Sequence, residues 1–262
     1  MNHFSVPVLT RLNRCAIIRH IPTATQEGGR QMAPPVMKNT SQQQAAKLDI
    51  LNYGLPDTHK TLAIGKLKSI GFNPLVFACD PGGLTTLNGM GIDFFEIDKP
   101  KTAFEILGMI YTNKFNLQKY NLVCIDGASN FSYMCLKATG EDSRDRRLDY
   151  ANGNINFRRF IDDVRRLPLH VYINAFEVEL KNANGNQLQY GAGCEGNKYA
   201  IQFTGLMNTV LRSFAYVDDK GATRTGIQTK YDGLHISRER TSSCDMYEPD
   251  IISVVKKILK FN

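Results

Sequence analysis

The sequence has no apolar run longer than about seven residues, which is too short to span a bilayer. It also has no early apolar segment of the kind that marks a secretory signal. The six cysteines are scattered, with no C-x-x-C pair and no histidine at a zinc-binding spacing. We therefore expect no membrane association, no zinc site, and buried thiols in a reducing compartment such as the cytoplasm.

Positive charge is concentrated at the start of the chain. Of the net charge of +7, residues 1–46 contribute about +4, because one acid stands against five basic residues. This segment mixes Gly, Pro, Gln and Ser without helical or strand periodicity, so we expect a basic, disordered arm before a core at 47–262. An organellar transit peptide, and hence an organellar matrix, is the lesser alternative. The core is only mildly basic, so net charge is weak support for nucleic-acid binding.

Beyond the arm, short apolar runs alternate with amphipathic segments. The runs typical of strands lie at 48–54, 74–80, 92–97, 120–126 and 170–176. The segments with helical spacing lie at 60–71, 102–115 and 154–167. Apolar strands separated by helices predict an α/β fold with a mainly parallel central sheet, covered by helices on both faces. After Gly196 the pattern predicts a β-rich C-terminal extension, with strands within 213–240 and a closing helix at 248–261.

The segment GLPDTHKT at residues 54–61 departs by one residue from the phosphate-binding pattern G-x-x-x-x-G-K-[ST]. Such a loop offers backbone N–H groups and a lysine to phosphates, and a hydroxyl to Mg²⁺. His59 replaces the second glycine, and histidine is one of the few side chains enriched at positive φ. An ordinary strand–turn–helix is the alternative. The candidate nucleotide-binding residues are Gly54, Asp57, Thr58, His59, Lys60 and Thr61.

Aspartates end two of the predicted strands. Asp126 ends the buried strand NLVCID, at the sheet edge where ligands bind in open α/β folds, so with Thr61 it predicts a Mg²⁺ site. Capping of the next helix is the alternative for Asp126. Asp80 begins the sequence D-P-G-G and is a candidate to position or deprotonate an attacking water, although turn chemistry explains it equally well. Together with Lys60, these residues predict a site for ATP and Mg²⁺.

In this order, the motifs resemble those of the RecA-like recombinase ATPases, especially the core-only forms encoded by bacteriophages. GLPDTHKT resembles the Walker A loop, NLVCID resembles the Walker B strand, and HVYINAFEVEL with the glycine-rich stretch 182–200 resembles the strand and loop that follow. The resemblance covers about residues 48–255. It implies a P-loop NTPase that hydrolyses ATP while bound to single-stranded DNA, in recombination, annealing or repair in the cytoplasm of a bacterial host.

The resemblance also implies roles for charged residues outside the phosphate loop. Arg238 and Arg240 match paired cations that reach a neighbouring subunit's ATP, which implies catalytic roles and head-to-tail assembly into a ring or filament. A solvated strand face is the alternative for this pair. The residues at positions that resemble the family's two DNA loops, where cations follow phosphates and rings stack on bases, are Arg144, Arg146, Arg147 and Tyr190. Nearby acids leave a solvated charged loop as the alternative.

Three residues depart from the family pattern. His59 stands for the loop glycine, Gly82 for the catalytic glutamate, and Ala175 for the glutamine of the Asn-Gln sensor. These changes leave open a nucleotide-binding or assembly module with little or no hydrolysis. A small-molecule P-loop kinase is a further alternative, although the sequence lacks an Arg-rich lid. Whether single-stranded DNA changes ATP turnover would discriminate among these hypotheses.

Overall fold

The computed structural model describes residues 47–80, 82–140, 146–181 and 188–260, so the predicted arm at 1–46 lies outside the described residues. The strands are β1 (Asp49–Gly54), β2 (Pro74–Ala78), β3 (Asp93–Glu96), β4 (Leu122–Asp126), β5 (His170–Lys181), β6 (Leu188–Ala192), β7 (Thr209–Val217), β8 (Thr223–Gln228) and β9 (Tyr247–Glu248). The helices are α1 (Leu62–Ser69), the short 3-10 helix η1 (Gly83–Leu87), α2 (Pro100–Tyr111), α3 (Ala128–Gly140), α4 (Arg146–Arg166), α5 (Asn197–Leu206) and α6 (Ile251–Leu259). In the described part of the chain, no helix has both the length and the apolarity to cross a membrane.

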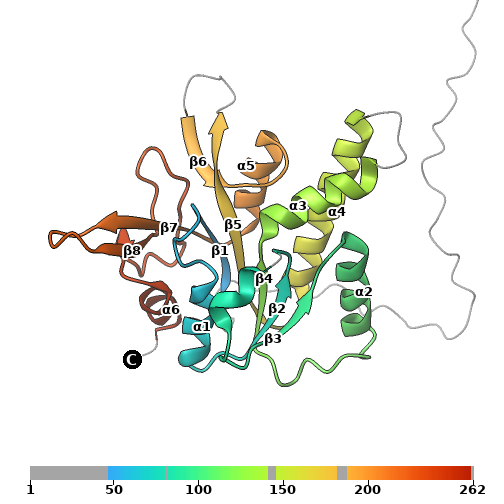
Figure 1. Ribbon diagram of the computed structural model, residues 1–262, viewed down its shortest axis with the longest axis horizontal. Helices are drawn as coiled ribbons and strands as arrows, with labels where there is room; N and C mark the ends of the chain where they lie inside the picture. The colour runs from blue at the N-terminus through green and yellow to red at the C-terminus, as the bar shows by residue number, and fades with distance from the viewer. Residues whose placement is uncertain (1–46, 81, 141–145, 182–187, 261–262) are drawn as a thin grey trace, which may run out of the picture. The chain divides into compact units, whose positions relative to one another are not determined.

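The strands form one sheet in the order β3-β2-β4-β5-β1-β7-β8-β9, with β6 paired to β5 (Figure 1). From β3 to β7 every pair is parallel, while β8 and β9 continue the sheet in antiparallel fashion and β6 folds back along β5. The fold class predicted from the sequence, including the β-rich C-terminal extension, is therefore confirmed. In this strand order, the carboxyl ends of β2, β4, β5 and β1 lie side by side along one edge.

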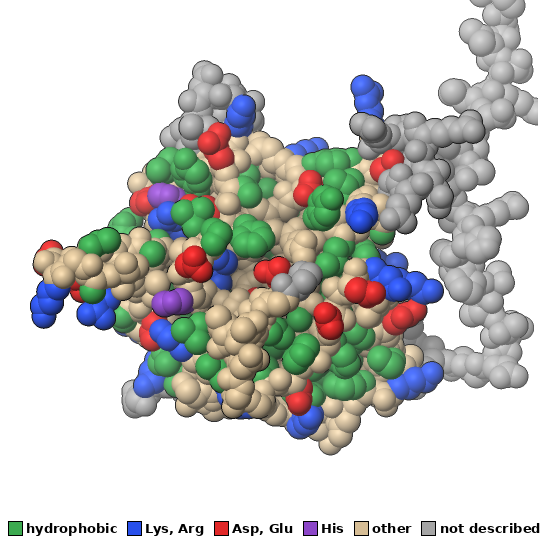
Figure 2. Space-filling view, viewed as in Figure 1, with side chains coloured by type: hydrophobic (Ala, Val, Ile, Leu, Met, Phe, Trp, Pro, Cys, Tyr) green, Lys and Arg blue, Asp and Glu red, His purple; other side chains and the backbone are tan. Residues whose placement is uncertain are grey.

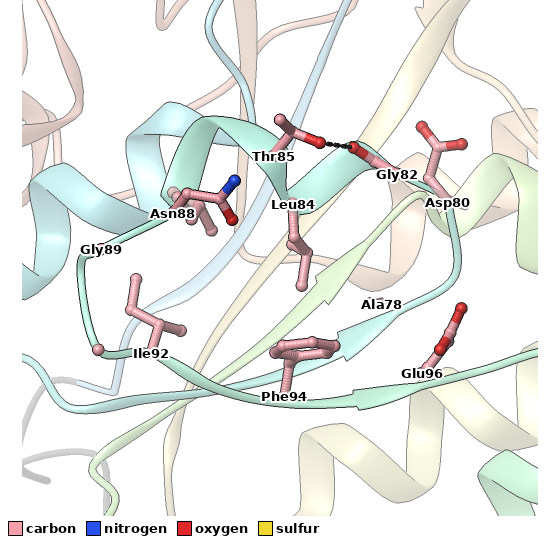
Figure 3. Close-up of a pocket in the computed structure, with 12 residues that line it drawn as sticks. Ala78, Asp80, Gly82, Leu84, Thr85, Asn88, Gly89, Ile92, Phe94 and Glu96 are labelled. Carbon is pink, nitrogen blue, oxygen red and sulfur yellow. Dashed lines mark hydrogen bonds between the residues drawn. The ribbon is translucent and has the colours of Figure 1, made fainter.

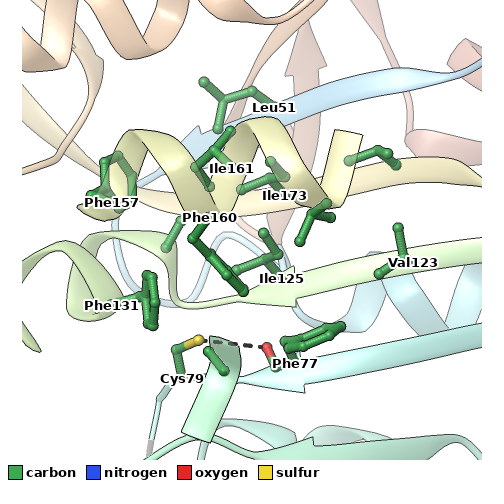
Figure 4. Packing of buried hydrophobic residues seen from close by; sticks show 14 of the residues in the cluster. Leu51, Phe77, Cys79, Val123, Ile125, Phe131, Phe157, Phe160, Ile161 and Ile173 are labelled. Atoms are coloured by element: carbon green, nitrogen blue, oxygen red, sulfur yellow. Dashed lines mark hydrogen bonds between the residues drawn. The ribbon is translucent and has the colours of Figure 1, made fainter. Parts of the chain in front are cut away.

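Helices cover both faces of the sheet, and each face has its own hydrophobic core. Strand β4 shows why its sequence is apolar throughout, because Val123 and Ile125 pack toward α2, α3 and α4 while Leu122 and Cys124 pack toward α1 and α6. Figure 4 shows the first of these cores, in which the ring centroids of Phe131 and Phe160 lie 4.3 Å apart. Burial on both faces holds the strand ends, and the residues that follow them, at fixed positions.

Three segments differ from the sequence prediction. Strand β3 is largely exposed, because it is the edge strand of the sheet, so the prediction of a buried strand there was wrong. Residues 234–240 form two isolated bridges, at His235 and Arg238, instead of a regular strand. Helix α4 begins at Arg146, so Arg146 and Arg147, which the resemblance places in the first DNA loop, are helical. Asp149 in its first turn favours this start, because an acid there complements the helix dipole.

Candidate functional site

A pocket of about 550 Å³ lies at the carboxyl ends of β1, β4 and β5. Its walls are residues 56–62 of the loop after β1, residues 80, 83 and 86 after β2, and residues 126–127 and 174–176 at the ends of β4 and β5. The structure thus brings together Lys60, Thr61, Asp80 and Asp126, which come from three separate stretches of sequence. Gly54 begins the loop but does not line the pocket.

The loop after β1 has the backbone geometry expected of it. His59 has φ 62° and Asp57 has φ 60°, so both are in the left-handed region. His59 thus takes up the conformation for which the usual pattern has a glycine, and its ring shares a hydrogen bond with the Thr225 hydroxyl on β8 (3.2 Å). Gly54 is required for a different reason, because a Cβ there would lie 2.3 Å from the carbonyl oxygen of Ser213.

Lys60 is held inside the loop. Its side chain is almost fully buried, and its Nζ donates to the Leu55 carbonyl (2.6 Å) and to Thr58 Oγ1 (3.3 Å). The amine also lies 5.8 Å from the centroid of the Phe176 ring. Burial lowers the pKa of Lys60 from 10.5 to about 8, and nearby carboxylates, Asp126 foremost, partly offset this effect. An anion entering the pocket would favour the charged form of this amine and so raise its pKa again.

Asp126 is the best-supported acidic residue of the site. Its Oδ1 accepts hydrogen bonds from the Thr61 hydroxyl (2.9 Å) and from the Asn174 amide, whose own oxygen accepts the Gly127 N–H (2.6 Å). Its Oδ2 is buried and has no hydrogen-bond partner among the described residues. Burial raises the pKa of Asp126. A buried carboxylate oxygen without a partner is costly, which indicates that the site is built to receive a cation or a donor.

Thr61 and Asp126 fit a magnesium ion shared with a ligand. Mg²⁺ binds through one or two carboxylates and completes its shell with water and substrate phosphates. Among the residues that the structure describes, no cluster of three or more His, Cys, Asp or Glu side chains could hold a metal by itself. The hydroxyl of Thr61 beside the unpartnered Oδ2 of Asp126 therefore suits a cation that arrives with phosphates.

Asp80 reaches the same pocket from the end of β2, the strand next to β4. A Cβ on Gly83 would lie 3.1 Å from Asp126 Oδ2 and 3.3 Å from Asp80 Oδ2, so the two carboxylates converge on one backbone position. Gly82 has φ 76°, a conformation that strains other residues. A glutamate at position 82 would be strained, and Gly82 lines a neighbouring pocket instead of this one. The backbone at position 82 therefore suits glycine and not the glutamate that the resemblance to RecA-like ATPases implies.

That neighbouring pocket, of about 420 Å³, lies between η1 and the edge strand β3 (Figure 3). Asp80 lies on the boundary, since it lines both pockets. The ring of Phe94 forms one wall opposite Leu84, and the carboxylate of Glu96 lies at the same end as Asp80. Phe94 is 55% exposed, so this wall is open to solvent.

The two predicted cations near the C-terminus lie outside the pocket of their own chain. Arg238 donates from Nη2 to three carbonyl oxygens at the C-terminal end of α5, at distances of 2.6 to 3.1 Å. These carbonyls belong to Thr204, Gly205 and Met207. Arg238 thus satisfies the end of a helix, where a cation is favoured. Arg240 is exposed.

The predicted nucleic-acid residues are only partly described. Arg144 lies outside the described residues, and Arg146 and Arg147 begin α4. Tyr190 lies on β6, where its ring stacks on His235 with centroids 5.4 Å apart. Figure 2 shows Lys and Arg side chains interspersed with Asp and Glu side chains across the described part of one face. A contact of any of these residues with nucleic acid stays a prediction.

Sequence reasoning missed a partly buried ion pair beside the site. Arg212 on β7 donates from Nε (2.6 Å) and Nη2 (3.3 Å) to the carboxylate of Glu177 on β5. The Glu177 side chain is only 6% exposed, and its charge raises the pKa of Lys60. No local signal marked these residues, because they meet through strands that are distant in the sequence. Asn174 carried a signal, since it stands in the sensor position of the resemblance.

The chain matches a known protein family. A family model described as an AAA domain matches residues 46–241, which is about three quarters of the chain. The matched region includes the loop after β1, Asp80, Asp126, Asn174 and the two C-terminal arginines. No curated protein matches the sequence.

Proposed function

This chain belongs to the AAA domain family, of P-loop NTPase type, and we propose that it is a RecA-like ATPase that acts on single-stranded DNA. In this proposal it binds ATP with Mg²⁺ and works in phage-type recombination, annealing or repair. One observation carries the nucleotide part, namely the unpartnered Oδ2 of Asp126 beside the Thr61 hydroxyl and Lys60. This arrangement matches what a magnesium-bound triphosphate requires of a P-loop.

The charges of the pocket support the need for magnesium. Three aspartates line it, and Lys60 is the one Lys or Arg among the described residues of its walls. A triphosphate would be repelled by these carboxylates unless a divalent cation neutralised them. In the proposed mechanism Lys60 binds the β/γ-phosphates, Thr61 and Asp126 hold the cation, and Asp80 positions or deprotonates the attacking water.

The same charges support head-to-tail self-association. No arginine is among the described residues of the pocket walls, so a cation that stabilises charge on the transferring phosphate would come from a second subunit. Arg240 is exposed and is the better candidate for this role, because Arg238 is bonded to the end of α5. The open edge of β3 and the pocket beside Asp80 offer a surface next to the nucleotide on which a second subunit could dock.

The DNA part of the proposal rests on the resemblance to RecA-like recombinases. The resemblance assigns contacts to Arg144, Arg146, Arg147 and Tyr190. Helix α4 begins at Arg146, and β6 follows residues 182–187, which lie outside the described part of the chain. Both elements therefore border stretches that resemble the DNA loops of RecA-like recombinases. Cations and aromatic rings at such positions suit a single-stranded ligand.

A nucleotide-dependent assembly module with little hydrolysis is the second candidate. It is favoured by the left-handed backbone at Gly82 and by the short side chain of Ala175, which is 2% exposed. Both positions lack the side chain that the family uses to activate water or to sense the γ-phosphate. In this case nucleotide binding would persist while turnover would be near zero.

Measurement of MgATP hydrolysis with and without single-stranded DNA tests the proposal. Lys60→Ala serves as the blank, and Lys66→Ala, on α1 but outside the pocket walls, serves as the matched control. We expect DNA-stimulated turnover in the unmodified protein and in Lys66→Ala, lost in Lys60→Ala. Turnover that does not respond to DNA would refute the DNA part. No turnover above the blank, with nucleotide binding retained, would favour the assembly module.

A further inference from the structure

A chain of buried polar side chains connects the centre of the sheet to the phosphate loop. Ser213 on β7 donates to Asn52 Oδ1 on β1 (2.9 Å), and Asn52 Nδ2 donates to the Tyr172 hydroxyl on β5 (2.8 Å). The Tyr172 hydroxyl then donates to the carbonyl oxygen of Lys60 (2.9 Å). All three side chains are buried, on three neighbouring strands in the order β5-β1-β7.

The three side chains of Ser213, Asn52 and Tyr172 form a relay, and this relay lies in an apolar environment. Tyr172 belongs to the hydrophobic cluster beneath α1 and α6, together with Ile50, Leu211 and Ile64. Apolar side chains of similar size would pack in such a place without the desolvation cost of three polar groups. Burial also raises the pKa of Tyr172, so its hydroxyl keeps the proton that it donates. The hydrogen bonds of the relay therefore all run in one direction. The last of them is accepted by the backbone carbonyl of Lys60, the residue whose amine would bind phosphate.

The geometry of the peptide bond explains how the hydrogen bond from Tyr172 orients the phosphate loop. The Lys60 carbonyl and the Thr61 N–H belong to one trans peptide, so they point in opposite directions. Because Tyr172 draws the carbonyl into the core, the Thr61 N–H is turned away from the core, where Lys60 and Thr61 line the pocket. The next turn of the helix closes without this carbonyl, since the Ile64 N–H donates to the Thr61 carbonyl (3.0 Å).

We infer that Tyr172, oriented by Asn52 and Ser213, is a positioning residue that aims the Lys60–Thr61 peptide at nucleotide phosphate. The inference deepens the proposed function and rests on its nucleotide-binding part. Tyr172 touches no substrate and acts only through the loop. Its hydroxyl sets which way a backbone donor of the loop faces before nucleotide arrives, so removal of the hydroxyl weakens binding without altering the residues of the pocket.

The test compares two buried tyrosines. Tyr172→Phe removes the hydroxyl that bonds the loop. Tyr53→Phe is the matched control, because Tyr53 is equally buried on β1 and its hydroxyl donates to the Tyr190 carbonyl (3.3 Å), away from the loop. We expect Tyr172→Phe to raise the Kd for MgADP about fivefold, the effect of one hydrogen bond, while Tyr53→Phe leaves it unchanged. Binding is measured by calorimetry at a temperature where circular dichroism shows each variant folded.

Hydrogen–deuterium exchange of the nucleotide-free protein gives a second readout. Peptides over residues 54–64 should exchange faster in Tyr172→Phe than in Tyr53→Phe, because the freed peptide samples other orientations. Ser213→Ala, at the far end of the relay, should show the same change to a smaller degree, and it replaces Tyr172→Phe if that variant does not fold. Unchanged exchange, or unchanged Kd in a protein that binds nucleotide, overturns the inference. Absence of binding by the unmodified protein refutes the proposed function, and exchange then decides the positioning role alone.

Discussion

The amine of Lys60 should determine how nucleotide binding depends on pH. In the free protein burial lowers its pKa to about 8. Phosphates next to the amine favour the charged form, so the pKa in the complex should return toward the ordinary value of 10.5 or above it. The complex therefore holds a proton that the free protein loses as the pH rises through 8, and binding takes up that proton. Affinity should fall as the solution becomes more alkaline.

The size of the effect follows from the fraction of protonated lysine. At about pH 7 the free amine is about nine-tenths protonated, and at about pH 9 it is about one-tenth protonated. The Kd for MgADP should thus rise about tenfold between these values, and proton uptake on binding should increase from about 0.1 to about 0.9 per site. Calorimetry in buffers that differ in ionisation enthalpy measures both the Kd and the proton count.

Two substitutions isolate the lysine from other titrating groups. Lys60→Arg keeps a cation that stays protonated throughout this range, so its Kd should be nearly independent of pH even if binding is weaker. Lys66→Arg makes the same change on α1 beside Asp250 and should keep the dependence of the unmodified protein. A tenfold rise in Kd that persists in Lys60→Arg would refute the assignment to Lys60.

Two further predictions concern stability. His59 has φ 62°, so the free energy of unfolding of His59→Ala in urea titrations should be about 1 kcal/mol lower than that of His59→Gly. Both variants lose the hydrogen bond to Thr225, and only alanine keeps the strained backbone. Equal stability would contradict this account. Arg238→Ala should lower the free energy of unfolding by about 2 kcal/mol, because three carbonyls at the end of α5 lose a charged donor, while Arg240→Ala should change it by less than about 0.5 kcal/mol in the same assay. Similar losses in the two arginine variants would contradict the capping role.

The parts of the site that local sequence determines could be predicted. The loop after β1 lies between a strand and a helix that are consecutive in the chain, so its residue types alone indicated its shape, including the positive φ at His59. Asp126 was predictable because a strand buried on both faces is apolar throughout, and a polar residue marks its end. Asp80 was placed by the same rule.

The parts that depend on strand neighbours could not be predicted. The apolar letters of β3 fit a buried strand, and only the sheet order makes it an edge on which Phe94 is exposed. A role of Arg238 in a neighbouring subunit stays a prediction, and the bond of its guanidinium to the end of α5 is a contact that no local pattern indicated. The charge and apolar pattern of a segment indicate which kinds of contact its residues favour. Which contact forms depends on residues from distant segments of the chain.

Tyr172 has one feature that local sequence predicts and another that depends on its strand neighbours. Within the apolar run HVYINAF, Tyr172 cannot be distinguished from a core residue, and its ring does pack in the core. Its hydroxyl has a second task only because β1 lies between β5 and β7 and brings Asn52 and Ser213 into line. A phosphate loop must hold its backbone donors in place before the ligand arrives, and the buried relay does this from outside the pocket walls. In this chain His59 leaves the loop strained, so the hydrogen bond from Tyr172 should matter more than in a loop with two glycines. Tyr172→Phe should therefore cost less affinity for nucleotide in a His59→Gly background.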